Sequence, residues 1–452
     1  MKIIIAGDGK VGSTLAKELS AEGYDLTMID SRQQVLEDTL EKYDLLTVTG
    51  NCAAMDTLQQ AGVADTDLLI AATSADEINL LCCMTAHNIN PDLHTIARIR
   101  NPEYTGQAYS MRDSFALSMA VNPERQAATE IERLLSLPGF LRRDTFAKGR
   151  VEIVELRVEE GSRLAGAALH SLNSIVKCKV LLCAVLRSGS VVMPGGNFVL
   201  QPGDRIFVTA PTSTLAALVK NLGLASRRVS RVMLAGGGRI SYYLADALAR
   251  SDVRVQLVEK DYGRCMELAA ALPKVNVIHG DASSQTVLER EDLAGCDALV
   301  SLTGLDETNL MVSLFATSLG VPQVITKISR MENSTILDSL PVGSLVCPKE
   351  LCCNTIVRYV RAMQNQKGAA LSVHMIAAGQ AEAMEFRADE TTQHCGEPLK
   401  KIQLRPNVLI ACITHGAETV IPDGDSHFEA GDIIIVVTNA NTVIGQLNQI
   451  FA

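Results

Sequence analysis

The stretch that decides the fold is KIIIAGDGKVG, residues 2–12, together with its recurrence as RVMLAGGGRIS at residues 231–241. Each stretch runs from a short apolar segment into a glycine-rich turn. Val11, Leu15 and Leu19 then follow at the spacing of one face of a helix. A strand, a tight glycine turn and a helix open the first unit of a doubly wound α/β sheet, where the turn can approach a phosphate group. We therefore predict two such units in one chain.

The repeat extends well beyond these turns. Residues 76–79, Asp-Glu-Ile-Asn, recur as Asp-Glu-Thr-Asn at 306–309, and Glu-Leu-Arg at 155–157 recurs as Glu-Phe-Arg at 385–387. Each copy therefore fills roughly half of the chain, which is far too long for the repeat of a solenoid. The sequence predicts a duplicated module with two different parts.

The first part of each copy alternates buried strands with helices, which is typical of a parallel sheet covered on both faces. The second part has shorter alternating strands broken by turns, and a linker helix joins the two. The predicted fold class is α/β, with two tandem Rossmann-like parallel-sheet domains, each followed by a small β-rich α+β domain. In copy one the predicted strands are 2–6, 25–30, 44–49, 66–72 and 93–98, and the helices between them begin near Lys10, Ser31, Met55 and Asp76. The predicted domain limits are 1–120, 141–225, 229–349 and 369–452, with linker helices at 121–140 and 350–368.

Composition narrows the function classes. With 41 basic and 51 acidic side chains the formal net charge is −10, which argues against binding to nucleic acid or to anionic lipid. The chain has no apolar run of about 18 residues and no signal-peptide layout at its start, so we expect a cytoplasmic protein that reaches a membrane only through a partner. The 12 cysteines include the adjacent pairs Cys82-Cys83 and Cys352-Cys353, which we expect to be reduced core residues, with a thiol sensor as the alternative. No Cys/His spacing suggests a metal site.

The first glycine turn has the residues of a nucleotide site. Asp30 ends the second predicted strand, where a carboxylate accepts hydrogen bonds from ribose hydroxyls and repels a 2′-phosphate, so NAD or an adenine nucleotide fits better than NADP. Other polar residues follow the third, fourth and fifth strands, whose carboxyl ends line the crevice. Arg98 and Arg100 could reach a phosphate or form surface ion pairs. The predicted site is Gly7, Asp8, Gly9, Lys10, Val11, Gly12, Asp30, Asn51, Thr73, Ser74 and Arg98.

The second copy departs from this pattern at one point. Ser241 takes the place of the third glycine, while Glu259 supplies the acidic side chain. The turn is therefore either a second nucleotide site or a copy kept for its fold. Lys327 and Arg330 are the counterparts of the two arginines. The predicted site is Gly236, Gly237, Gly238, Arg239, Ile240, Glu259, Asp281, Thr303 and Lys327.

This duplicated arrangement resembles the TrkA family of Trk potassium-uptake systems, whose modules are RCK (or KTN) domains. The resemblance rests on residues 2–12, Asp30, the motif at 76–79 and 306–309, and Arg98–Tyr104, and it covers essentially the whole chain. Ser241, and Asn51 where copy two has Asp281, depart from it.

The resemblance implies a peripheral regulatory subunit on the inner face of the cell membrane. Four two-copy chains would form a homo-oligomeric ring of eight RCK modules beneath a Trk-type membrane channel subunit. NAD(H) and ATP or ADP would bind to the ring and change its shape and the opening of the channel.

An NAD-dependent dehydrogenase is the alternative reading. It would need an acid or base placed against the nicotinamide, and none of the eight histidines occupies matching positions in the two copies. His279 ends a predicted strand, and this position favours a structural role over a catalytic one. A nucleotide-responsive transcription factor would need a basic recognition helix, and none is evident. The sequence therefore predicts a regulator with no catalytic residues.

Overall fold

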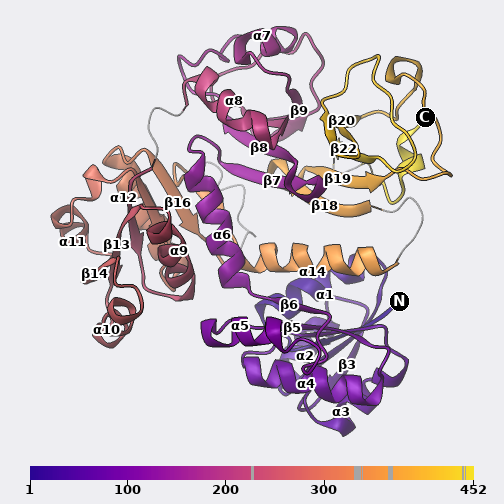
Figure 1. Cartoon of the computed structure of the whole chain (residues 1–452), viewed down its shortest axis with the longest axis vertical. Coiled ribbons are helices and arrows are strands. Elements are labelled where there is room, and N and C mark those ends of the chain that lie inside the picture. The colour runs from indigo at the N-terminus through magenta and orange to yellow at the C-terminus, as the bar shows by residue number, and fades with distance from the viewer. Residues whose placement is uncertain (225–228, 330–336, 338–339, 365–369, 440–441, 443) are drawn as a thin grey trace. The chain divides into compact units, whose positions relative to one another are not determined.

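The computed structural model describes residues 1–452 except 225–228, 330–336, 338–339, 365–369, 440–441 and 443 (Figure 1). The prediction for Arg330 lies outside the described residues. The chain divides into two compact units. The first comprises Met1–Ala128 with Cys347–Val360, and the second comprises Thr129–Val346 with Arg361–Ala452.

The first unit contains a six-stranded parallel sheet in the order β3-β2-β1-β4-β5-β6. Sequential strands move outward from β1 in one direction and then from β4 in the other, so the order reverses between β1 and β4. In such sheets ligands bind at this reversal, outside the carboxyl ends of the strands. The five predicted strands are confirmed, whereas the three-residue β6 was missed. The strands are β1 (Lys2–Ala6), β2 (Asp25–Asp30), β3 (Leu46–Thr49), β4 (Leu68–Ala71), β5 (His94–Arg98) and β6 (Met119–Val121).

Helices cover both faces of this sheet, which explains why its central strands are apolar throughout. Ile4 and Ala6 belong to one buried cluster with Leu58 of α3 and Cys82 and Cys83 of α4. The alternate side chain Ile5 points to the other face, toward α1. The helices are α1 (Lys10–Ala21), α2 (Gln33–Leu40), α3 (Met55–Gln60), α4 (Asp76–Ile89) and α5 (Pro102–Ser110).

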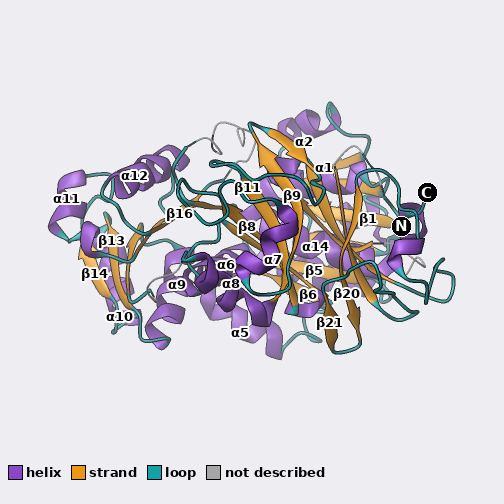
Figure 2. Cartoon of the chain, turned by 90° about the horizontal axis from the view of Figure 1, so that it is seen from above, coloured by secondary structure: helices purple, strands orange, loops and turns teal. Residues whose placement is uncertain are grey.

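The second unit repeats the design in a sheet of order β14-β13-β12-β15-β16-β17. Helices α9 and α10 lie on one side of it, and α11 and α12 lie on the other (Figure 2). The strands are β12 (Arg231–Ala235), β13 (Arg254–Glu259), β14 (Asn276–His279), β15 (Ala298–Ser301), β16 (Gln323–Lys327) and β17 (Ser344–Val346). The helices are α9 (Arg239–Arg250), α10 (Tyr262–Ala271), α11 (Gln285–Arg290) and α12 (Asp306–Ser318).

The linker helices pack in a way that the sequence did not predict. Helix α14 (Pro348–Gln364), which follows the parallel sheet of copy two, packs on the parallel-sheet domain of copy one. The thiol of Cys353 donates to the carbonyl of Val11 at 3.7 Å, and the Tyr359 hydroxyl lies 2.9 Å from Nδ1 of His94. Helix α6 (Pro123–Ser136) follows the parallel sheet of copy one, and its residues from Thr129 onward belong to the second unit. There Gln323 of β16 donates to the carbonyl of Leu134 at 2.9 Å.

Each copy ends in a five-stranded antiparallel sheet. The order is β10-β9-β11-β8-β7 in copy one and β18-β19-β22-β20-β21 in copy two. This confirms the predicted fold class. Within the described ranges, no helix combines the length and the apolar character needed to cross a bilayer. The elements of copy one are β7 (Arg142–Phe146), β8 (Val151–Arg157), α7 (Leu172–Val176), β9 (Leu181–Arg187), β10 (Ser190–Val192), β11 (Arg205–Pro211) and α8 (Leu215–Leu222). Those of copy two are β18 (Ala370–Ile376), β19 (Ala381–Arg387), β20 (Val408–His415), β21 (Glu418–Val420) and β22 (Ile433–Asn439).

Candidate nucleotide-binding sites

The three glycines of the first turn have different structural roles. Gly7 has a φ of +101°, and a Cβ there would lie 2.9 Å from the Cα of Thr73 at the end of β4. A Cβ on Gly12 would lie 1.9 Å from the carbonyl oxygen of Gly7. A Cβ on Gly9 would meet nothing within 4 Å. Packing thus requires the first and third glycines, whereas the second borders open space.

That open space lies at the amino end of α1. The helix begins at Lys10, its N-cap is Gly9, and no side chain caps it. The first N–H groups of an uncapped helix need an acceptor, and the helix dipole makes this end favourable for an anion. The geometry therefore fits a phosphate group.

Asp30 closes the turn from the neighbouring strand. Its Oδ2 accepts the backbone N–H of Asp8 at 2.9 Å, and its Oδ1 accepts the backbone N–H of Arg32 at 2.9 Å. Burial opposes the charge, but these N–H groups and the Arg32 guanidinium outweigh it and hold the pKa of Asp30 below its ordinary value. The carboxylate is therefore ionised and fixed. Nε of Arg32 also donates to Oδ1 at 3.3 Å, so Oδ2 is the oxygen that keeps acceptor capacity for a ribose hydroxyl.

Asp8 is buried, and sequence reasoning missed its partner. The Thr39 hydroxyl of α2 donates to Oδ2 of Asp8 at 2.5 Å, while Oδ1 finds no hydrogen-bond partner among the described residues. Burial and the nearby charge of Asp30 raise the pKa of Asp8 above its ordinary value. Asp8 thus ties the glycine turn to α2 and places a second acidic group beside Asp30.

The second turn keeps this geometry although its third glycine is replaced. Gly236 has a φ of +104°, and a Cβ on Gly238 would again meet nothing within 4 Å. Ser241 is fully buried, and its hydroxyl donates to the carbonyl of Gly236. Glu259 accepts the backbone N–H of Gly237 at 2.6 Å, as Asp30 does for Asp8. The substitution by serine is therefore accommodated by a hydrogen bond.

Two positions that form a hydrogen bond in copy one form an apolar contact in copy two. Gly237 stands where copy one has Asp8, and Leu268 stands where it has Thr39. A Cβ on Gly237 would lie 2.7 Å from Cδ1 of Leu268, so a larger residue would require this leucine side chain to shift. Arg264, whose counterpart is Val35, donates to the carbonyl of Gly237 at 2.9 Å. The second turn therefore accepts a hydrogen bond from Arg264, whereas the first turn is tied to α2 through Asp8 and Thr39.

The repeated motif at 76–79 and 306–309 is a brace between strand ends. The Oδ1 of Asn79 accepts the backbone N–H of Thr73 at 2.8 Å, and its Nδ2 donates to the carbonyl of Arg98 at 2.8 Å. Asn309 makes the same bonds to Thr303, at 2.8 Å, and to Lys327, at 3.0 Å. The asparagine joins the ends of the fourth and fifth strands and so shapes the crevice.

The basic residues at the ends of β5 and β16 point toward this crevice edge. Arg98 donates to the carbonyl of Thr73, and Lys327 donates to the carbonyl of Thr303 at 2.5 Å. Burial, and then the charge of Arg100, lower the pKa of Arg98. Arg100 itself donates to the carbonyl of Ser74 at 2.6 Å. Both copies thus place a cation at the same strand end.

The remaining predicted residues lie at the rim. Lys10 and Arg239 are the first residues of α1 and α9 and are exposed, whereas Val11 and Ile240 are buried in the first helical turns. Asn51 accepts the N–H of Ala53 at 3.1 Å. Asp281 accepts the N–H and the hydroxyl of Ser283 at 2.8 and 2.7 Å, which lowers the pKa of Asp281. At both positions the side chain stabilises its own turn.

Comparison with known proteins identifies the family. The TrkA-N domain model matches residues 3–123 and 232–348, and the TrkA-C domain model matches residues 153–223 and 383–450. The chain belongs to the TrkA family. It is similar to the "Trk system potassium uptake protein TrkA" of Haemophilus influenzae, with 31% identity covering 100% of this chain and 98% of the relative.

Solved structures with low identity share the TrkA-type fold. The crystal structure of the GsuK RCK domain matches with a TM-score of 0.61 at 18% identity, covering 97% of this chain and 92% of that one. The GsuK channel bound to NAD matches with a TM-score of 0.60 at 18% identity, covering 97% of this chain and 77% of that one. These matches show the RCK fold. In each TrkA-N segment of our chain the glycine turn and its acidic residue lie together.

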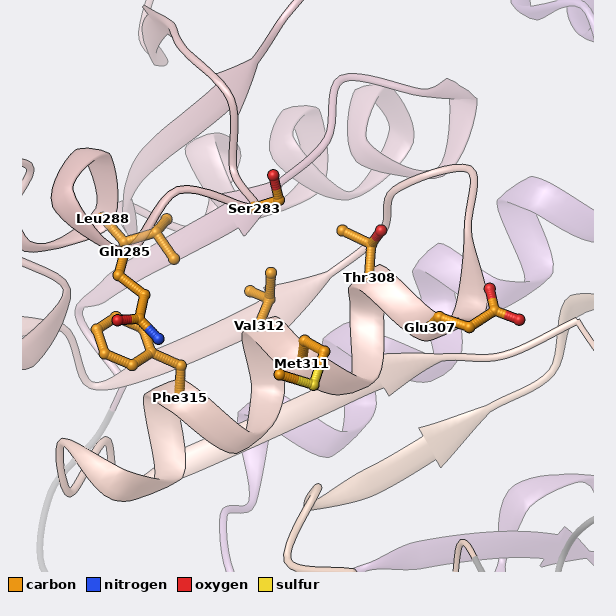
Figure 3. A pocket seen from close by; sticks show the side chains of 8 residues that line it. All are labelled: Ser283, Gln285, Leu288, Glu307, Thr308, Met311, Val312 and Phe315. Carbon is orange, nitrogen blue, oxygen red and sulfur yellow. The ribbon is translucent and has the colours of Figure 1, made fainter.

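The second TrkA-N domain also has a pocket between α11 and α12. Its volume is about 330 Å³, and Figure 3 shows Met311 and Val312 of α12 facing it, with Ser283 above them. Its polar end adjoins the turn of Asp281 through the Ser283 hydroxyl. The pocket is lined by Ser283, Gln285, Leu288, Glu307, Thr308, Met311, Val312 and Phe315.

Proposed function

We propose that the chain is the cytoplasmic, nucleotide-binding regulatory protein of a Trk-type potassium-uptake system. The observation that carries the proposal is the open side of each glycine turn, at Gly9 and Gly238, next to a fixed acidic side chain, Asp30 or Glu259. An uncapped helix end faces phosphate there, while the carboxylate faces ribose. Membership of the TrkA family supplies the link to potassium uptake.

The proposed ligands are NAD(H) and the adenine nucleotides ADP and ATP. An acidic group at the ribose position disfavours a 2′-phosphate, which separates these ligands from NADP. The structural relative with bound NAD supports NAD as one of them. The proposed binding residues are Gly7 to Gly12, Asp30, Asn51, Thr73, Ser74 and Arg98 in copy one, and Gly236 to Ile240, Glu259, Asp281, Thr303 and Lys327 in copy two.

The proposed assembly is a ring of eight RCK modules from four chains, docked beneath a membrane channel subunit. Exposed apolar side chains at equivalent positions of α4 and α12 support a surface for assembly. Leu81 is 50% exposed, and its counterpart Met311 is 65% exposed. The proposal of an interface here rests on the recurrence of an exposed apolar side chain at the same position in both copies.

The proposed mechanism is a population shift. A nucleotide that binds one ring conformation more tightly transfers that difference in binding free energy to the gate. A difference of about 1–3 kcal/mol changes the conformational equilibrium roughly 5–150-fold.

The proposal assigns no catalytic step to the chain. His279, at the end of β14, lies with its Nε2 3.1 Å from the carbonyl of Lys260 and packs its ring against Tyr262. Incubation of the purified protein with NADH and small carbonyl substrates tests this assignment. Any turnover of the cofactor above a no-enzyme control would support the dehydrogenase reading instead.

The regulatory proposal is tested in two steps on the full chain. Native mass spectrometry reports the subunit number and any co-purified nucleotide, and we expect four chains with bound NAD(H) or an adenine nucleotide. Potassium flux is then measured in vesicles that contain a Trk-type channel subunit with this chain, with and without each nucleotide. Absence of binding to every adenine nucleotide, together with unchanged flux, would overturn the proposal.

A further inference from the structure

The two small antiparallel sheets of the second unit pack against each other through a shared apolar core. One buried cluster contains residues of β7, β8, β9 and β11 from copy one and of β19, β20 and β22 from copy two. Its largest members include Phe146 and Phe207 from copy one and Ile376 and Ile435 from copy two. The C-terminal domain of copy one therefore has the C-terminal domain of copy two as its partner.

Equivalent faces of the two domains meet. Asp144 of β7 pairs in register with Ile153 of β8, and His374 of β18 pairs in the same way with Ala383 of β19. The residues after the two edge strands, Ala147 and Ala377, have φ values of +50° and +51°. Two related domains that present the same face to each other form a pseudo-twofold interface.

The contacts at the rim of this interface are reciprocal. Arg150 of copy one donates to the carbonyl of Gly416 in copy two. The equivalent side chain Gln380 of copy two donates to the carbonyl of Gly189 in copy one at 2.7 Å. Neither contact distinguishes one copy from the other, because the acceptor in both is a backbone carbonyl.

At the centre of the interface, the same position holds an acidic residue in copy one and a histidine in copy two. Asp144 and His374 occupy the same position in the two copies, and Oδ1 of Asp144 lies 3.1 Å from Nδ1 of His374. Both side chains are nearly buried, with 11% and 8% exposed. Arg142 lies 2.9 Å from Oδ2 of Asp144, and the imidazole packs against the ring of Phe146. The pair is thus complementary only between unlike copies.

A second position reinforces the difference. Glu385 of copy two accepts the backbone N–H of Ala147 across the interface at 2.9 Å. Its counterpart Glu155 is held inside copy one by Arg205. Ile433 occupies the position of Arg205 in copy two, and Glu385 accepts the Ser372 hydroxyl at 3.5 Å where Glu155 is paired with an arginine.

We propose that this face of the first C-terminal domain is built to accept the second C-terminal domain and to reject a second copy of itself. Pairing of two first domains would set Asp144 against Asp144 in a buried site, where two carboxylates cannot both be ionised without a large cost. If two second domains paired, His374 would lose the Asp144 carboxylate as its partner. The interface therefore keeps the chain's own two halves together and leaves other surfaces for contacts between chains. This inference does not depend on nucleotide binding or on a channel partner.

The test is a charge swap in the full chain. His374→Asp creates the like-charged pair, Asp144→His creates the histidine pair, and the double variant exchanges the two residues. Breaking a buried carboxylate–imidazole hydrogen bond is a large perturbation, so we expect each single variant to lower the unfolding temperature by roughly 3–8 °C. The double variant should recover part of that loss, because it restores the pair but leaves Arg142 without its carboxylate partner. Single losses that simply add in the double variant, or no loss at all, would overturn the proposal.

A cross-link supplies an independent readout of the pairing. Lys179 of copy one lies 2.9 Å from Asp423 of copy two, and both side chains are more than half exposed. A carbodiimide should join them within one chain in the wild type and in the double variant, and less so in the single variants. Cross-linked peptides that join copy one to copy one in the wild type would refute the proposal. If His374→Asp is insoluble, Asp144→Asn and His374→Asn provide the same cycle with milder changes.

Discussion

Gly9→Val should separate ligand binding from folding. Gly9 has a φ of −91° and a ψ of −169°, an extended conformation open to valine. Its Cβ would meet nothing within 4 Å, so we expect the free energy of unfolding to stay unchanged or to rise by up to about 1 kcal/mol. The new side chain occupies the space that a phosphate needs against the N–H groups of α1. Loss of one or two charge-assisted hydrogen bonds costs about 2–5 kcal/mol, which raises Kd roughly 30- to 5,000-fold.

Gly12→Ala is the matched control. Its Cβ would lie 1.9 Å from the carbonyl oxygen of Gly7, so this variant should unfold at a lower temperature, with a cost of about 1–3 kcal/mol or more. Titration calorimetry with NADH and ADP gives the number of sites and their affinity, and scanning calorimetry of the same samples gives stability. We expect Gly9→Val to remove one site from the titration. Unchanged site number and affinity would refute a phosphate site at Gly9, and a stability loss as large as that of Gly12→Ala would show that this glycine serves packing.

Four further outcomes are expected. Asp30→Asn should weaken NADH binding and narrow the preference for NADH over NADPH, because the charge that repels a 2′-phosphate is gone; an unaltered affinity ratio in calorimetry would contradict this. Asn79→Ala and Asn309→Ala should each lower the free energy of unfolding by about 2–4 kcal/mol, because each removes the hydrogen bonds that join two strand ends. A loss of less than about 0.5 kcal/mol in chemical denaturation would contradict the role of the asparagine as a brace. Burial is outweighed by Arg142 and His374, which hold the pKa of Asp144 at about 2, below its unfolded value of 3.8. The ionised Asp144 therefore stabilises the fold by about 2 kcal/mol above pH 4, and this contribution is lost as the pH falls from about 4 to 2. Asp144→Asn should flatten this acid part of the curve of stability against pH. Met311→Glu should reduce the subunit number seen by native mass spectrometry, whereas retention of the full assembly would place the interface elsewhere.

Local sequence patterns were enough to predict most of the parallel sheets. A buried strand, a glycine turn and an amphipathic helix are specified by residues close together, and β1 to β5 follow the predicted limits within about two residues. The three-residue β6 carries too little periodicity to be recognised. The exchange of linker helices could not be predicted either, because the partner of α14 is set by buried contacts such as that of Cys353 with Val11, which are distant in sequence.

The same limit applies to the sites. The glycines and Asp30 could be assigned because their spacing reflects one local geometry. The role of Thr39 depends on a contact between α2 and the glycine turn, and it leaves no local motif. The motif at 76–79 was noticed as a repeat, but its function as a brace required the positions of Thr73 and Arg98. A comparison of the two copies offered a usable signal, since Asp8 and Thr39 change together to Gly237 and Leu268.

Fusion of two copies in one chain explains why such paired changes can exist. In a symmetric dimer of identical chains, every substitution occurs on both sides of the axis, so a central residue must tolerate its own copy. Here Asp144 faces His374 at the equivalent position, which identical chains could not provide. The same freedom lets the second turn hold Arg264 beside Gly237 while the first holds Asp8 beside Asp30.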